Sequence, residues 1–225
     1  LAAGPLLGIV PVERAGHGYG SSTIFLILGG CLLALALERW QLHRRIAFYI
    51  VTRAGSSARR LVLGVMSASA FVSMWVSNTS TTLMMLPVAV SIAALVAPAH
   101  ETADPERRNF ATAIVLAVAY SCTIGGLATL IGTPTNALAV AFMEQTYGVR
   151  PSFAEWMVFG VPCSLLLLFG AWWVLVAVSH PFRLPDIAGA RELVRTELRS
   201  LGPLTVPERR VAAVGAAAAI AWIAS

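Results

Sequence analysis

Two polar interruptions in otherwise apolar sequence are the places where this chain could do chemistry. Residues 73–82 read Ser-Met-Trp-Val-Ser-Asn-Thr-Ser-Thr-Thr and lie between the uncharged apolar segments 61–71 and 83–96. Residues 132–136, Gly-Thr-Pro-Thr-Asn, interrupt the apolar stretch 110–142. Burying hydroxyl and amide groups in hydrocarbon is costly unless each group finds a partner. Each interruption therefore predicts a broken membrane helix whose polar groups meet protein, water, an ion or a ligand.

The helix ends at such breaks can bind ions without charged side chains. A half-helix that begins near Thr79 presents unpaired N–H groups and a positive dipole end, which suit a carboxylate or a sulfate. The half-helix that ends near Ser77 presents unpaired carbonyls, which suit Na⁺. No Arg, Asp or Glu occurs in residues 61–98 or 109–143. A bound dianion would need co-bound cations for charge balance, and this indicates cation coupling.

Two other interpretations compete with a binding site: a purely structural role for the polar residues, and an enzyme active site. Ser, Thr and Asn in membrane helices often serve as hydrogen-bonding contacts between helices, and glycine pairs allow close packing. Two separate breaks, each with Asn and Thr, favour the binding site. An intramembrane hydrolase with Ser77 as its nucleophile would need a general base, but the apolar segments around the breaks contain no His, Lys, Asp or Glu. The sequence therefore predicts no enzyme.

The composition indicates a membrane protein with several spans. Of the 225 residues, 57% are hydrophobic and only 12% are charged, about half the charged fraction of a soluble domain. The net charge of +5 comes from sixteen arginines, with no lysine, against eleven acidic residues. The arginines cluster between apolar runs, as cytoplasmic loops do, so a nucleic-acid partner is not expected. The three cysteines lie inside apolar runs without metal-ligand spacing, which argues against a disulfide framework.

The apolar runs predict an all-α, polytopic architecture. We expect a first span at Ser22–Leu37, an interfacial helix at Trp40–Ala54 and a further span at Trp156–Val178. Leu61–Trp75 is too short to cross a bilayer core of about 30 Å. We therefore expect it to form a re-entrant hairpin with the following segment, in which Pro87 kinks or weakens the helix.

The arginine-rich loops and the chain ends complete this outline. If residues 39–60 are cytoplasmic, the hairpin and the later spans return every arginine-rich loop to the same side, as the positive-inside rule requires. The polar loop 181–210 is expected to hold a helix at Ala190–Ser200. The chain begins with Leu1 and stops within the apolar run 211–223. We expect it to be a piece of a longer transporter.

Three ordered motifs resemble the divalent anion/sodium symporter family, which carries dicarboxylates, citrate or sulfate. The sequence FVSMWVSNTSTTLMMLP at 71–87 is similar to the family's Ser-Asn-Thr signature, and IGGLATLIGTPTN at 124–136 is similar to its second motif. The segments FLILGG at 25–30 and ALALE at 34–38 resemble its preceding span. Many members have Pro-Pro-Asn where this chain has Pro-Thr-Asn at 134–136. The resemblance extends over about residues 20–142.

The resemblance implies roles for six residues at the two breaks. The sodium ligands would be Ser73, Ser77, Asn78 and the backbone of Gly132, and the substrate carboxylate would contact Asn78, Thr79 and Thr133. The family fold implies one half of an inverted-repeat transporter that works as a homodimer with an elevator-like shift. A second Ser-Asn-Thr hairpin completes the family's site, and this chain has only one copy.

The same resemblance divides the chain into three parts. Residues 1–60 would hold the first span and an interfacial arm of the scaffold. Residues 61–147 would be a transport part with a re-entrant hairpin at 61–97 and a broken helix at 109–147. Residues 148–225 would hold the next span, a cytoplasmic loop and the start of a truncated span.

The predicted function is sodium-coupled symport of small di- or tricarboxylates such as succinate, malate, fumarate or citrate. The coupling ion is Na⁺, no organic cofactor is expected, and the location is a bacterial plasma membrane. A sulfate or other oxyanion carrier is the alternative within transport. A non-transporting membrane subunit is the alternative from another class.

Overall fold

The computed structural model describes residues 22–55, 57–97, 104–184, 186–187 and 189–224. These residues form helices connected by short turns, and the only β-pairing among them is one isolated bridge, between Ser57 and Asp186. This confirms the all-α prediction. The helices are α3 Ser22–Arg39, α4 Leu42–Arg53, α5 Ala58–Ser73, α6 Asn78–Val96, α7 Pro105–Gly126, α8 Pro134–Tyr147, α9 Phe153–Trp173 with a π-helical extension η1 Val174–Ser179, α10 Ala190–Ser200 and α11 Val206–Ala224.

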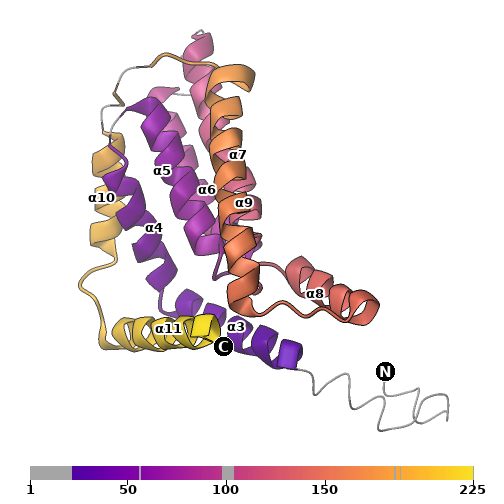
Figure 1. The fold of residues 1–225 in the computed structure, drawn as a ribbon. Coiled ribbons are helices and arrows are strands. Elements are labelled where there is room, and N and C mark those ends of the chain that lie inside the picture. Colours follow the sequence, from indigo (N-terminus) through magenta and orange to yellow (C-terminus); the bar gives the residue numbers. More distant parts are fainter. Residues whose placement is uncertain (1–21, 56, 98–103, 185, 188, 225) are drawn as a thin grey trace, which may run out of the picture.

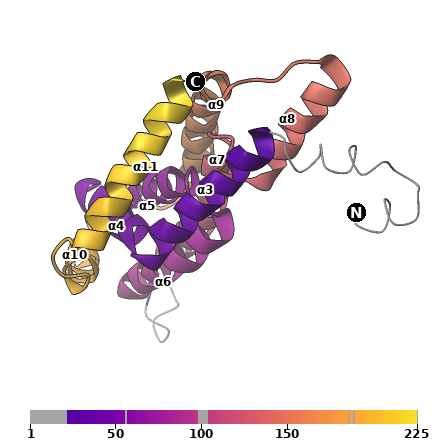
Figure 2. The ribbon, with the colours of Figure 1, turned by 90° about the horizontal axis from the view of Figure 1, so that it is seen from below.

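Helices α4, α5, α6, α7 and α9 run roughly alongside one another, and α10 lies against α4 (Figure 1). Helices α3 and α11 lie side by side across the end of this bundle where α7 stops, as both views show (Figures 1 and 2). Helix α8 leaves the bundle at the same end. The two helix breaks and the α3–α11 pair thus share one end of the molecule.

The core forms where α7 packs along both helices of the α5–α6 pair. A β-carbon added to Gly125 of α7 would lie 2.2 Å from the carbonyl oxygen of Ala70 in α5, so the two backbones touch at this point. Only glycine permits that approach. The largest fully buried side chains of the core are aromatic or long aliphatic, among them Phe48, Leu61, Met66, Met85, Ile92, Phe110 and Ile114. The pairing of α5, α6 and α7 therefore fixes the relative positions of the two breaks.

Three helices are long and apolar enough to cross a membrane: Asn78–Val96, Pro105–Gly126 and Phe153–Ser179. A fourth span results if the bent pair Phe25–Arg39 and Leu42–Arg53 is counted as one. The two members of that pair are inclined by 72° to each other. The bend is at Gln41, which adopts the left-handed conformation with φ of 56°, so α3 and α4 are separate helices, as the sequence predicted.

The observed boundaries differ from the expected ones in small ways that have physical causes. Helix α5 is a short helix of 16 residues, as expected for Leu61–Trp75, but it begins at Ala58 and ends at Ser73. Helix α6 continues through Pro87, so this proline does not end the helix. The expected span at Trp156–Val178 begins earlier, at Phe153, because Ser152 and Glu155 form a capping box there.

Candidate functional site

The turn between α5 and α6 contains the first break. Helix α5 ends at Ser73, and Ser77 caps α6 by accepting a hydrogen bond of 3.2 Å from the backbone N–H of Ser80 to its Oγ. The first N–H groups of α6 have no helical carbonyl to pair with. The positive end of the α6 dipole therefore points out of the turn, near Asn78 and Thr79. Such an end favours an anion.

Ser73 connects the turn to α7. Its side chain is fully buried, and its Oγ lies 2.6 Å from Asn78 Oδ1 and 2.8 Å from the carbonyl oxygen of Cys122. A hydroxyl carries a single proton, so Ser73 can donate fully to only one of these two acceptors. A cation at Asn78 Oδ1 would favour the hydrogen bond from Ser73 to Cys122 and would leave a lone pair of Oγ toward the cation.

The second break is packed directly against the first. A β-carbon on Gly126, the last residue of α7, would lie 2.5 Å from Asn78 Oδ1. A β-carbon on Gly132, in the α7–α8 turn, would lie 2.5 Å from the carbonyl oxygen of Gly126. The Asn78 amide, Gly126 and Gly132 are therefore stacked in contact. A side chain at Gly132 would meet the backbone of Gly126 and separate the two breaks, whereas a side chain at Gly126 would displace the Asn78 amide.

Two side chains in or near the α7–α8 turn hold it in this shape. Asn136 is buried and its Nδ2 donates to the carbonyls of Gly126, at 2.8 Å, and Thr129, at 2.7 Å. Thr129 Oγ1 donates to the carbonyl of Met74 at 2.6 Å and accepts from the N–H of Gly132 at 3.1 Å. The Thr129 hydroxyl thus ties one break to the other. Neither residue was among the predicted ligands, although Asn136 is one of only three asparagines in the chain and lies at a break.

Several backbone carbonyls at the C-terminal ends of α5 and α7 are already hydrogen-bonded, whereas the sequence predicted unpaired carbonyls at the end of the first half-helix. Carbonyls at these ends accept hydrogen bonds from side chains of other segments. The pairs are Met74 with Thr129, Cys122 with Ser73, Ile124 with Ser164, Gly126 with Asn136, and Leu127 with Trp156. A carbonyl oxygen has two lone pairs and keeps one of them for a further partner. These bonds hold the carbonyls in fixed directions.

The predicted substrate contacts lie at the outer side of this arrangement. Thr79 is exposed in the first turn of α6, and Thr133 is half-buried at the N-cap of α8 with extended backbone angles. The Thr133 side chain makes no capping bond to α8. Helices α6 and α8 both begin here, so two positive helix ends are present at the paired breaks.

The six predicted site residues thus divide into two groups. Ser73, Asn78 and Gly132 meet through Gly126, with Ser77 at the cap of α6, four residues after Ser73. This group offers hydroxyl, amide and backbone oxygens, the neutral hard ligands that suit an alkali cation. The other two residues, Thr79 and Thr133, follow the tips of the two breaks, and no hydrogen bond joins their side chains within the described residues. This chemistry fits a cation beside an anion and needs no fixed charge.

The chain resembles known proteins over almost its whole length. A family model described as "Sodium:sulfate symporter transmembrane region" matches residues 4–225. The sodium-dependent dicarboxylate transporter SdcS of Staphylococcus saprophyticus is 38% identical over 224 residues, which are 97% of this chain and 43% of that protein. The transporter of the same name from Staphylococcus aureus strain USA300 is 37% identical over 97% of this chain and 42% of its own length.

The chain therefore spans less than half the length of these relatives. The matching proteins are membrane transporters and not enzymes, in agreement with the apolar helices found here. The match of the family model to nearly the whole chain shows that it belongs to the divalent anion/sodium symporter family.

Proposed function

We propose that the full-length protein is a sodium-coupled symporter of small dicarboxylates, with succinate, malate and fumarate as the first candidates and citrate as a larger one. The single observation that carries this proposal is the position of the Asn78 amide. It touches Ser73 on one side and Gly126 on the other, at the point where the two breaks meet. The names of the relatives support Na⁺ as the coupling ion and dicarboxylates as substrates.

In this mechanism Ser73, Ser77, Asn78 and the Gly132 backbone hold a sodium ion, which supplies the positive charge that the site lacks. Asn78 faces both groups of ligands, since its carbonyl oxygen is directed to Ser73 and its amide nitrogen remains a donor. Thr79 and Thr133 donate hydroxyl hydrogen bonds to a substrate carboxylate. Sodium binding would orient the Asn78 amide before the substrate arrives, and this explains coupling without a charged side chain.

The proposal includes the placement of the site in a bacterial plasma membrane. The α5–α6 pair would be a re-entrant hairpin and α7–α8 a broken helix, together forming the transport part at residues 61–147. Residues 1–60 and 148–225 would supply scaffold and connecting helices. A homodimer and the second half of an inverted repeat would complete the transporter. The second half is supported by the length of the relatives, since this chain spans 43% of one of them.

The test is uptake of labelled succinate into proteoliposomes that contain the full-length protein. Asn78→Ala and Thr79→Ala should abolish Na⁺-dependent uptake while insertion into the membrane is preserved. Gly170→Ala is a matched control, because a β-carbon there meets no atom within 4 Å. Normal uptake by both site variants would refute the assignment. Wild-type protein without any Na⁺-dependent uptake would favour a non-transporting subunit.

A sulfate or other oxyanion carrier is the second candidate, favoured by the description of the family model. The helix ends that would receive a carboxylate can also receive a sulfate. Competition decides between the two: excess sulfate should leave succinate uptake unchanged in a dicarboxylate carrier. Strong inhibition by sulfate, together with uptake of labelled sulfate, would select the second candidate.

A further inference from the structure

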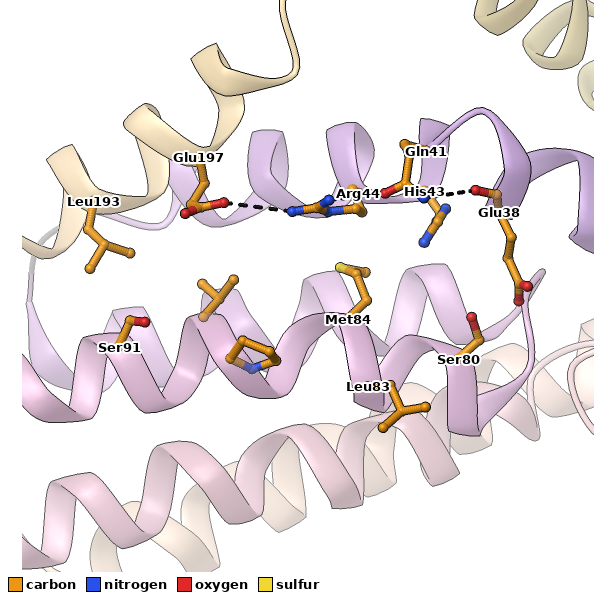
Figure 3. Close-up of a pocket in the computed structure, with 12 residues that line it drawn as sticks. Glu38, Gln41, His43, Arg44, Ser80, Leu83, Met84, Ser91, Leu193 and Glu197 are labelled. Carbon is orange, nitrogen blue, oxygen red and sulfur yellow. Dashed lines mark hydrogen bonds and ion pairs between the residues drawn. The ribbon is translucent and has the colours of Figure 1, made fainter.

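A polar cavity of about 470 Å³ lies between α4, α6 and α10. Its volume is within the range of small-ligand sites. One end is formed by Glu38 at the end of α3, His43 at the start of α4 and Ser80 in the first turn of α6, and the other end by Leu193 and Glu197 of α10 (Figure 3). The cavity is separate from the ligands proposed above, although Ser80 follows Thr79 in sequence.

His43 presents a fixed hydrogen-bond acceptor to this cavity. The residue is 5% exposed, and its Nδ1 lies 2.9 Å from the carbonyl oxygen of Leu37. A carbonyl can only accept, so Nδ1 carries the proton and Nε2 of the neutral ring carries a lone pair. Nε2 has no partner among the described residues. Figure 3 shows the ring directed from α4 into the space in front of α6.

The charges that line the cavity leave one negative charge unbalanced. Arg44 is the only cation in the lining, and Glu38 and Glu197 are its two carboxylates. Arg44 lies between the two ends and is engaged on both sides, because its Nη2 is 3.7 Å from Glu197 Oε2 and its Nη1 donates to Gln41 Oε1 at 3.1 Å (Figure 3). The Glu38 carboxylate makes no ion pair or hydrogen bond within the described part of the chain. An occupant of this end should therefore be a cation.

The ligand atoms select the kind of cation. Glu38, His43 and Ser80 offer a carboxylate, an imidazole nitrogen and a hydroxyl oxygen, which are three acceptors at one end of the cavity. Among the described residues, no three His, Cys, Asp or Glu side chains form a group that could hold a metal ion. A protonated primary amine carries three N–H donors, one for each of these acceptors, whereas a quaternary ammonium carries none.

We propose that this end of the cavity binds a primary ammonium group. The group can come from the headgroup of phosphatidylethanolamine or from a small soluble amine. The lipid source agrees with the wall of the cavity, where Leu83 of α6 is 69% exposed and Pro87 lies one turn further along the same helix. The three acceptors belong to α3, α4 and α6, so the bound amine would hold the bend between α3 and α4 against the hairpin.

Native mass spectrometry of the full-length protein from nanodiscs tests this site. We expect retention of phosphatidylethanolamine over phosphatidylcholine with the same acyl chains. Glu38→Gln should reduce this preference at least about tenfold, the effect of losing one charge-assisted hydrogen bond. Glu197→Gln is the matched control, because it removes the same charge from the other end of the cavity and should leave the preference unchanged.

The remaining outcomes either support the ammonium site or overturn it. If Glu38→Gln does not fold, judged by its thermal unfolding, Ser80→Ala takes its place and should also weaken retention. If ethanolamine in solution raises the melting temperature of the wild-type protein but not of Glu38→Gln, and the lipid is not retained, the source is a soluble amine. Equal retention of the two lipids with no effect of ethanolamine would overturn the proposal, as would equal loss in the Glu38 and Glu197 variants.

Discussion

Gly126→Ala tests the contact between the two breaks most directly. The new β-carbon would lie 2.5 Å from Asn78 Oδ1, 3.0 Å from its Nδ2 and 3.1 Å from its Cγ. The first distance is about 1 Å below the optimal separation of non-bonded heavy atoms. The side chain of Asn78 must move away, and its 2.6 Å contact with Ser73 is lost as a consequence.

The expected effect is a weaker sodium site in a protein that still folds. Alanine is the better helix former by about 0.5–1 kcal/mol, so the substitution does not destabilise α7 through its backbone preference. Loss of one oxygen ligand to a cation is comparable to the loss of a charge-assisted hydrogen bond, which predicts a fall in Na⁺ affinity of roughly 10- to 100-fold. Substrate affinity at saturating Na⁺ should fall as well, since Asn78 is proposed to contact both the sodium ion and the substrate carboxylate.

The assay is the Na⁺ concentration for half-maximal succinate uptake in proteoliposomes of the full-length protein. Gly170→Ala, whose β-carbon meets no atom within 4 Å, is the control for a glycine-to-alanine change in a membrane helix. An unchanged half-saturating Na⁺ concentration in Gly126→Ala, with normal melting temperature, would refute the argument that Asn78 and Gly126 form the site together.

Three further substitutions report on the surrounding structure. Asn136→Ala removes the donor to the Gly126 carbonyl and one of the two donors to the Thr129 carbonyl, which keeps the Gly132 N–H at 3.3 Å. The free energy of unfolding should fall by about 1–3 kcal/mol, read as a lower melting temperature in detergent. Gly125→Ala should prevent folding or lower the melting temperature sharply, because its β-carbon would lie 2.2 Å from a backbone oxygen of α5. Burial raises the pKa of Glu208, but hydrogen bonds from Thr205 and Arg45 outweigh it, so the net pKa lies below the ordinary 4.5. The stabilisation from ionised Glu208 is present above pH 4.5 and is lost as the pH falls through the lower folded-state pKa, so the melting temperature of the wild-type protein should drop more than that of Glu208→Gln as the pH is lowered below 4.5.

For each substitution, a different result would contradict the structural argument behind it. An Asn136→Ala protein as stable as the wild type would mean that water satisfies the turn carbonyls. A fully stable Gly125→Ala would show that α5 and α7 are further apart than the structure has them. Parallel pH profiles for the wild type and Glu208→Gln would mean that the carboxylate is not held by its neighbours.

The positions of the helices and of the two breaks were predictable from local patterns. Long uncharged runs predict spans because a membrane interior tolerates few charges, and helix-breaking glycine and proline in residues 132–136 predict an unwound segment. Ala190–Ser200 was predicted with the boundaries that are observed. The hydroxyls and amides of Ser73, Asn78 and Thr133 also stand out locally, because polar residues in apolar runs need partners.

The partners of these groups depend on residues distant in the sequence, and only the tertiary structure decided them. Thr129 reaches Met74 across 55 positions, and Ser73 reaches Cys122 across 49, because α7 packs into the α5–α6 pair. Such contacts depend on how the surfaces of two helices pack against each other. The residue pattern along a single helix does not reveal which residues of another helix it will contact. The same holds for His43, which falls in the helix Trp40–Ala54 that was expected to lie at the membrane interface and which the structure buries near the bend between α3 and α4.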